Sequence, residues 1–221
     1  MMADQLPLDL EWPSDYSDEA FIQGPANQAA YDWIKRWPDW PQNTLAISGG
    51  RGAGKTHLAS LAAEQSGAIT LPACLLHQLE WRQHRHFVIE NGPPEAAGEP
   101  ILFHIINWVR ECDGSLLITG CKPPAQWPVA LADCASRLRA MMHVAIAEPD
   151  DTLLTQLLYR LFERKGGRLA PDVSQYIIAR IERSFAGVKS CVLRVNHLSM
   201  VKKAPISINL VRQAMGWTAG A

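Results

Sequence analysis

Short apolar runs alternate with helical patterns over the first two thirds of the chain. Between the runs, segments 56–65 and 101–112 repeat apolar residues at the spacing of an amphipathic helix. Because strands that alternate with helices build a parallel sheet covered on both faces, we expect an open α/β sandwich up to about residue 148. The five expected strands are 44–48, 68–71, 86–89, 115–119 and 143–147.

After Pro149 the pattern predicts helices alone. Leucine and phenylalanine recur at helical spacing from residue 153 to 162, and Gly166 and Gly167 follow, where a left-handed residue commonly closes a helix. Pro171 suits the first turn of a second helix, which runs on through Ile181. Two further helices are expected over 186–198 and 208–215. The sequence therefore predicts a small all-helical domain over residues 149–221.

Charge is balanced overall but unevenly distributed. The 221 residues carry 21 Lys and Arg against 22 Asp and Glu, and this net charge of -1 argues against a free-standing nucleic-acid binder. Residues 1–34 contain no Lys or Arg and seven acids: Asp4, Asp9, Glu11, Asp15, Asp18, Glu19 and Asp32. The remaining 15 acids leave residues 35–221 with a surplus of six positive charges.

The N-terminal composition predicts an acidic, flexible segment over residues 1–19, ahead of a domain over 20–148. No run approaches the roughly 18 apolar residues of a membrane span, and no signal peptide is recognisable, so we expect a cytoplasmic protein. The five scattered cysteines favour reduced thiols over disulfides or zinc ligands.

The strongest motif follows the first expected strand and opens a helix. Its glycines let the backbone curl so that amide groups face phosphate oxygens, while a Lys reaches the β- and γ-phosphates and a Thr hydroxyl takes a place on Mg²⁺. The alternative is an ordinary glycine-rich turn. The motif predicts a site for ADP or ATP with Mg²⁺. It comprises Gly49, Gly50, Arg51, Gly52, Ala53, Gly54, Lys55 and Thr56.

An acid stands at the tip of the third expected strand. Glu90 would occupy the metal side of a phosphate site, where Asp is usual, and Asn91 falls where a catalytic acid would be. An amide cannot accept a proton from water, so we expect nucleotide binding with weak hydrolysis. The alternative is that Glu90 and Asn91 merely begin the loop at Pro93.

Arg137 lies in a helical stretch just before the fifth expected strand. An isolated arginine is commonly a solvated surface residue or an ion-pair partner. In oligomeric ATPases, however, an arginine from this segment can reach the γ-phosphate held by a neighbour.

The motifs together resemble a known family. They are FIQGPAN at 21–27, GGRGAGKT followed by HLA at 49–59, LLIT at 116–119 before PP, SRL at 136–138, and the helical end. In order and spacing they resemble the AAA+ region of the DnaA family of bacterial replication initiators, and within it the Hda-type regulators, over residues 12–215. The resemblance implies an AAA+ sheet sandwich with a helical lid.

The resemblance also implies roles for single residues. Phe21, Ile22 and Asn27 would lie at the adenine end of the nucleotide site, with His57 beside the loop. Thr119 would be the sensor-one residue. Arg137 would be an arginine finger acting on another protein, and Lys189 the sensor-two residue, where Arg is usual; the neighbouring Arg183 and Arg180 are alternatives.

A short N-terminal peptide resembles the motif with which replication proteins engage the sliding clamp. In it Gln5 can form several hydrogen bonds, and Leu6, Leu8 and Leu10 can enter apolar pockets of a groove. Pro7 limits the entropy lost when an extended peptide is ordered. The alternative is a leader whose leucines pack on the sheet.

The resemblance implies a regulator of replication initiation rather than an efficient ATPase. ADP-bound protein on the DNA-loaded clamp, the β subunit of DNA polymerase III, would present Arg137 to ATP held by DnaA and promote its hydrolysis. DNA would be contacted indirectly through the clamp, since no helix-turn-helix domain is expected after the lid. Two alternatives are an autonomous ATPase or loader and a nucleotide-gated DNA-binding protein, and the chain could also self-assemble.

Overall fold

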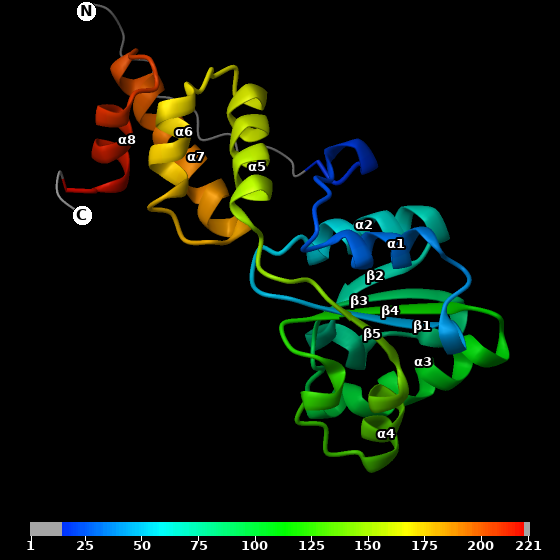
Figure 1. Ribbon diagram of the computed structural model, residues 1–221. Coiled ribbons are helices and arrows are strands. Elements are labelled where there is room, and N and C mark those ends of the chain that lie inside the picture. The colour runs from blue at the N-terminus through cyan, green and yellow to red at the C-terminus, as the bar shows by residue number, and fades with distance from the viewer. Residues whose placement is uncertain (1–14, 219–221) are drawn as a thin grey trace, which may run out of the picture. The chain divides into compact units, whose positions relative to one another are not determined.

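A five-stranded parallel sheet forms the centre of the first part of the chain. The structure, a computed structural model, describes residues 15–218 (Figure 1). It divides into an α/β unit, Tyr16–Glu148, and a helical unit that begins at Pro149. The strand order is β2-β3-β4-β1-β5, which confirms the expected α/β sandwich. The strands are β1 (Thr44–Ser48), β2 (Ile69–Pro72), β3 (His86–Gly92), β4 (Ser115–Gly120) and β5 (Met142–Ala145).

Strand β1 lies between β4 and β5, and all five of its residues are buried. Leu45 is opposite Leu117 on β4 and Met142 on β5. A strand covered on both faces has no side that faces solvent, so its sequence does not alternate between apolar and polar residues that point in opposite directions. This burial fixes the position at which the chain leaves the sheet after Ser48.

Two helices cover each face of the sheet (Figure 1). Helices α1 (Gln28–Lys35) and α2 (Lys55–Ser66) share one apolar cluster with β1, in which Ile34 and Leu58 are fully buried. Helices α3 (Glu99–Glu111) and α4 (Ala132–Ala140) share a second cluster on the other face, with Leu102 and Leu138. The unit is therefore a three-layer sandwich.

Trp127 closes the sheet where β3 and β4 end. The pairing of the two strands shifts between Ile89 and Gly92. A Cβ atom at Gly92 would collide with the Trp127 indole, and one at Gly120 would lie 2.8 Å from its Cζ2 atom. Glycine at both positions lets the indole pack directly on the strand ends beside the predicted nucleotide site.

The helical unit consists of α5 (Asp151–Arg164), α6 (Pro171–Ile178), α7 (Phe185–Lys202) and α8 (Ile208–Met215). Side-chain oxygens of Asp150, Ser184 and Ser207 cap α5, α7 and α8 by accepting backbone N–H groups. Helix α6 ends three residues before Ile181, and α7 continues four residues beyond the expected 198. All four helices share one core that includes Leu158, Phe162, Ile177 and Val195.

The end of the acidic N-terminal segment is attached to the α/β unit. Asp18 accepts hydrogen bonds from the Tyr31 hydroxyl at 2.9 Å and from Lys35 Nζ at 2.8 Å. The His57 Nε2 donates to the Ser17 carbonyl oxygen at 2.7 Å. The composition of the N-terminal segment predicts flexibility through residue 19. In the structure, these contacts hold residues 17 and 18 against α1 and α2. Within residues 15–218, no helix has the length and apolar character needed to cross a membrane.

Two partly buried histidines should make the stability of the α/β unit depend on pH. Burial lowers the pKa of His143, which lies 2.8 Å from the Ser48 hydroxyl, and burial with the nearby Arg85 lowers that of His86. Below the ordinary value of 6.5 the unfolded chain therefore binds more protons than the folded one. We expect the free energy of unfolding to be highest above pH 6.5 and to fall as the pH decreases toward the folded-state pKa values.

Urea unfolding between about pH 7.5 and about pH 5.5 tests this expectation. The His143→Gln variant should lose part of the pH dependence, whereas His77→Gln, at an exposed position, should keep the wild-type profile. An unchanged profile for His143→Gln would contradict the assignment.

Candidate nucleotide site

The glycine-rich loop joins the end of β1 to the start of α2 at the carboxyl edge of the sheet. Gly52 and Gly54 have φ angles of 73° and 91°, in the left-handed region that favours glycine. A Cβ atom at Gly49 would lie 3.1 Å from the Cβ atom of Ile146, the residue directly after β5, so a larger residue at position 49 would push the loop away from the end of that strand. The loop is thus built for a tight curl at the N-terminus of a helix, as anion binding requires.

Lys55 is the first residue of α2 and is only 7% exposed. Its Nζ donates hydrogen bonds to the carbonyl oxygens of Gly49 at 2.8 Å and Gly50 at 2.7 Å. Burial lowers the pKa of Lys55, while the charges of Cys121 and Glu90 act to raise it. A cation held with so little solvation gains strongly from an anion placed beside it.

The tips of β3 and β4 meet beside this loop. The Asn91 backbone N–H donates to the Thr119 hydroxyl at 3.4 Å, and Thr119 is buried. Asn91 has a φ of 60°, a left-handed conformation that asparagine tolerates better than most residues. Glu90 is half-buried and close enough to affect the Lys55 pKa. The structure therefore brings Glu90, Asn91 and Thr119 to the edge that carries the loop.

Cys121 is a residue at this edge that the sequence motifs do not indicate. It is exposed, it follows β4 directly, and its thiol lies near enough to Lys55 to influence that pKa. In the sequence, the feature that could have indicated Cys121 is its position immediately after the expected sensor-one strand. A lone cysteine has no motif, so only the fold places it here.

The segment from Phe21 to Asn27 forms a closed turn beside α2. Asn27 is 1% exposed; its Oδ1 accepts the Gly24 N–H at 2.9 Å and its Nδ2 donates to the Ile22 carbonyl at 2.9 Å. Phe21 meets the His57 ring edge-on at 5.1 Å, and its Cε2 lies 3.5 Å from where a Gly54 Cβ would be. These contacts place Phe21, Ile22, Asn27 and His57 next to the loop.

Oxygen groups suited to Mg²⁺ also lie at this edge. Thr56 is exposed at the first turn of α2, and Glu90 forms no ion pair among residues 15–218. No group of three His, Cys, Asp or Glu in this part of the chain could hold a metal ion alone. Few protein ligands are what Mg²⁺ uses when phosphate oxygens and water complete its shell. The residues present therefore fit a nucleotide-bound Mg²⁺.

Three further groups of expected residues do not belong to the part of the α/β unit described above. Arg137 is on α4, close to the start of β5 and thus near the amino edge of the sheet, opposite the loop. Lys189 is exposed on α7 of the helical unit. The expected clamp residues Gln5, Leu6, Leu8 and Leu10 lie outside the described residues.

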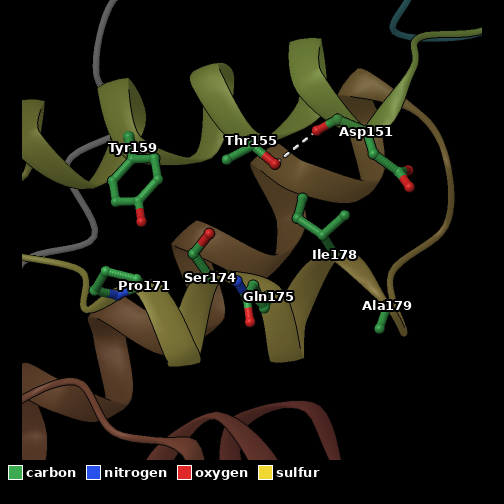
Figure 2. A pocket seen from close by; sticks show the side chains of 8 residues that line it. All are labelled: Asp151, Thr155, Tyr159, Pro171, Ser174, Gln175, Ile178 and Ala179. Atoms are coloured by element: carbon green, nitrogen blue, oxygen red, sulfur yellow. Dashed lines mark hydrogen bonds between the residues drawn. The ribbon is translucent and has the colours of Figure 1, made fainter.

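The helical unit has a groove of its own, between α5 and α6. Its volume is about 460 Å³, and Tyr159, Ser174 and Gln175 face it from the two helices (Figure 2). The Thr155 hydroxyl donates to the Asp151 carbonyl oxygen at 2.6 Å. Among residues 15–218, none of the expected nucleotide-binding residues lines this groove.

Comparison with known proteins finds DnaA among those similar to this chain in sequence and in fold. No protein-family model matches the chain. The chain is 24% identical over 229 residues to the chromosomal replication initiator protein DnaA of Symbiobacterium thermophilum, covering 90% of this chain and 50% of that protein. The crystal structure of domain III of the Thermotoga maritima replication initiation protein DnaA superposes with a TM-score of 0.78 at 16% identity, covering 92% of this chain and 97% of that one.

A structure of replication initiator DnaA bound to AMPPCP and single-stranded DNA also superposes. Its TM-score is 0.70 at 18% identity, over 85% of this chain and 67% of that one. The fold and the glycine-rich loop define a P-loop protein of the AAA+ class. The chain is similar in sequence to DnaA, as its motifs indicate, and it spans about half the length of the curated relatives it matches.

Replacing Gly54 by Ala should strain the loop. A left-handed residue with a Cβ costs about 1–2 kcal/mol, so the Gly54→Ala variant should unfold at a lower urea concentration. Gly50→Ala is the matched control, because nothing lies within 4 Å of its Cβ position and its φ is not left-handed. Equal stability of the two variants would contradict the loop geometry.

Proposed function

We propose that this protein is a nucleotide-binding regulator that promotes hydrolysis of ATP held by DnaA while attached to the DNA-loaded sliding clamp. The observation that carries the proposal is that two chemically different groups lie at opposite edges of the sheet in one domain. A phosphate loop beside a neutral amide, Asn91, lies at one edge of the sheet, and an exposed arginine, Arg137, lies near the other.

Nucleotide binding is supported by the loop and by the AMPPCP complex of the DnaA homologue. Lys55 would leave the Gly49 and Gly50 carbonyls to meet the phosphates, which supply the opposite charge that its buried position lacks. Thr56 and Glu90 would hold Mg²⁺, which neutralises phosphate charge when bound. Phe21, Ile22, Asn27 and His57 would contact the adenosine end, and Thr119 would sense the phosphates as sensor one.

Hydrolysis by the protein itself should be weak. The position after Glu90 is Asn91, whose amide cannot take a proton from an attacking water. The backbone N–H of Asn91 donates to the Thr119 hydroxyl, and this hydrogen bond links the tips of β3 and β4. The site is therefore better suited to holding ADP or ATP than to turning it over.

Arg137 would act on another protein. Its side chain is exposed and forms no ion pair among residues 15–218. Because α4 leads into the amino end of β5, Arg137 is separated from its own loop by the length of the strands. A planar guanidinium presented there can form two hydrogen bonds with a γ-phosphate and offset the charge of the transition state.

Lys189 is the preferred candidate for sensor two. Of the two alternatives, Arg183 pairs with Asp151 at 3.0 Å, and the Arg180 guanidinium lies 4.0 Å from the centre of the Tyr176 ring. Lys189 is exposed and in no ion pair within the described range. Attachment to the clamp would use Gln5, Leu6, Leu8 and Leu10 and raise the local concentration of Arg137 near DnaA.

The decisive experiment measures hydrolysis of DnaA-bound ATP in the presence of clamp loaded on DNA. Wild-type protein should accelerate hydrolysis, and Arg137→Ala should reduce the acceleration by about 10³-fold, the effect of removing an arginine finger. The Gln5→Ala variant should lose the acceleration in reactions in which the clamp must bring the two proteins together. Arg139→Ala, an exposed neighbour on α4, is the matched control.

If the Arg137→Ala variant accelerates hydrolysis of DnaA-bound ATP as much as the wild-type protein does, the proposal is wrong. Steady ATP turnover by the purified protein alone, abolished by Lys55→Ala, would instead identify an autonomous ATPase.

A second function is favoured by a surface of aromatic and basic side chains, where 3₁₀ helix η4 (Trp81–Gln83) packs on α3. The Trp81 and His104 rings stack at 5.7 Å with an interplanar angle of 9°, and Arg82 lies 5.0 Å from the Trp81 ring. Trp108 meets Trp81 edge-on. Aromatic faces beside cations suit stacking of unpaired bases, and a DnaA homologue is bound to single-stranded DNA.

Fluorescence anisotropy with a labelled single-stranded oligonucleotide tests this second function. Replacing Trp81 by Ala should weaken binding by about 1–3 kcal/mol, and added salt should weaken it further. Tyr159→Ala on α5 is a control that leaves the surface intact. No binding by wild-type protein at low salt, with and without nucleotide, would exclude DNA binding at this surface.

A further inference from the structure

A second arginine, Arg110, accompanies Arg137 at the amino edge of the sheet. Arg110 is in the last turn of α3, and α3 and α4 pack together through a shared core that contains Val109 and Leu138. Both helices end where the chain turns into the first residues of β4 and β5. The fold therefore brings two side chains that are 27 positions apart to one edge.

Arg110 is held in an unusual electrostatic state. One of its terminal nitrogens donates to the Gln42 side-chain oxygen, but its buried Nε has no hydrogen-bond partner among residues 15–218. Burial lowers the pKa of Arg110, and the charge of Arg137 lowers it further. A cation that is desolvated, incompletely hydrogen-bonded and next to a like charge is stabilised when an anion approaches.

No described carboxylate neutralises this pair. Neither Arg110 nor Arg137 forms an ion pair within residues 15–218. Glu111 and Asp113 are close in sequence but form no ion pair there. Arg85 is held close to the end of α3, where its Nε donates to the Cys112 carbonyl oxygen at 3.0 Å.

We propose that Arg110 is a positioning residue for Arg137, and that the two guanidinium groups form one receptor for the phosphate groups of a nucleotide held by a partner protein. The positive charge of the half-buried Arg110 repels the Arg137 guanidinium and keeps it extended into solvent. It also raises the positive potential that a triphosphate meets as it docks. This inference rests on the proposed function in one respect, namely that Arg137 faces a partner's nucleotide.

Kinetics of the stimulated reaction test the positioning role. Arg110→Gln should raise the KM for ATP-loaded DnaA about tenfold, as expected for one unit charge several ångströms away, with a smaller effect on kcat. It should also weaken the dependence of KM on salt. Arg110→Lys keeps the charge and should restore most of the wild-type KM, whereas a role in packing alone would make the two variants equal.

A direct binding measurement separates this inference from the proposed function. The protein saturated with ADP is titrated with inorganic tripolyphosphate while NMR follows the Nε–Hε signals of its arginines. We expect the Arg137 signal to shift, and the Arg110→Gln variant to need about tenfold more tripolyphosphate for the same shift. Arg139→Gln, which changes an exposed arginine two residues from Arg137, should leave the titration unchanged.

The titration has two outcomes that overturn the inference: an Arg137 signal that does not move, or one that moves equally in wild type and Arg110→Gln. If it moves as expected but no DnaA-bound ATP is hydrolysed, the phosphate receptor stands and only its proposed partner fails.

Discussion

The burial of β1 is the constraint on which the rest of the α/β unit depends. All five of its residues pair with β4 on one side, four of them pair with β5 on the other, and no polar side chain is exposed along it. β1 has a neighbouring strand on each side and an apolar cluster on each face. The chain leaves the sheet after Ser48, and the glycine-rich loop begins there. Lys55 is consequently placed under the loop with little solvent, which makes a phosphate its natural partner.

Parallel topology then assigns different chemistry to the two edges of the sheet. Residues that follow strands, such as Glu90 and Thr119, gather at the carboxyl edge with the loop, as ligand sites of open α/β sheets commonly do. Residues that precede strands, such as Arg110 and Arg137, gather at the amino edge. In the proposed function, one domain would thus hold a nucleotide at one edge and offer cations to a second protein at the other.

Much of this arrangement could be predicted from the sequence. The five apolar runs identified the strands, and β1 matches its expected range of 44–48 because a fully buried central strand has an uninterrupted apolar pattern. Boundaries were less predictable where an element is longer or shorter than its local pattern. β3 continues to Gly92 because Trp127 packs on its glycine, and α6 ends before Ile181, which is nevertheless buried.

The sequence by itself determined the class of fold, the loop and the identity of its chemical groups, because those are written in local periodicity and in a motif of adjacent residues. Only the tertiary structure decided which distant side chains meet. Cys121 beside Lys55, Asp18 bonded to Tyr31 and Lys35, and Arg110 beside Arg137 all join separate elements. Local pattern carries no signal for such pairs, since their proximity follows from how helices and strands pack.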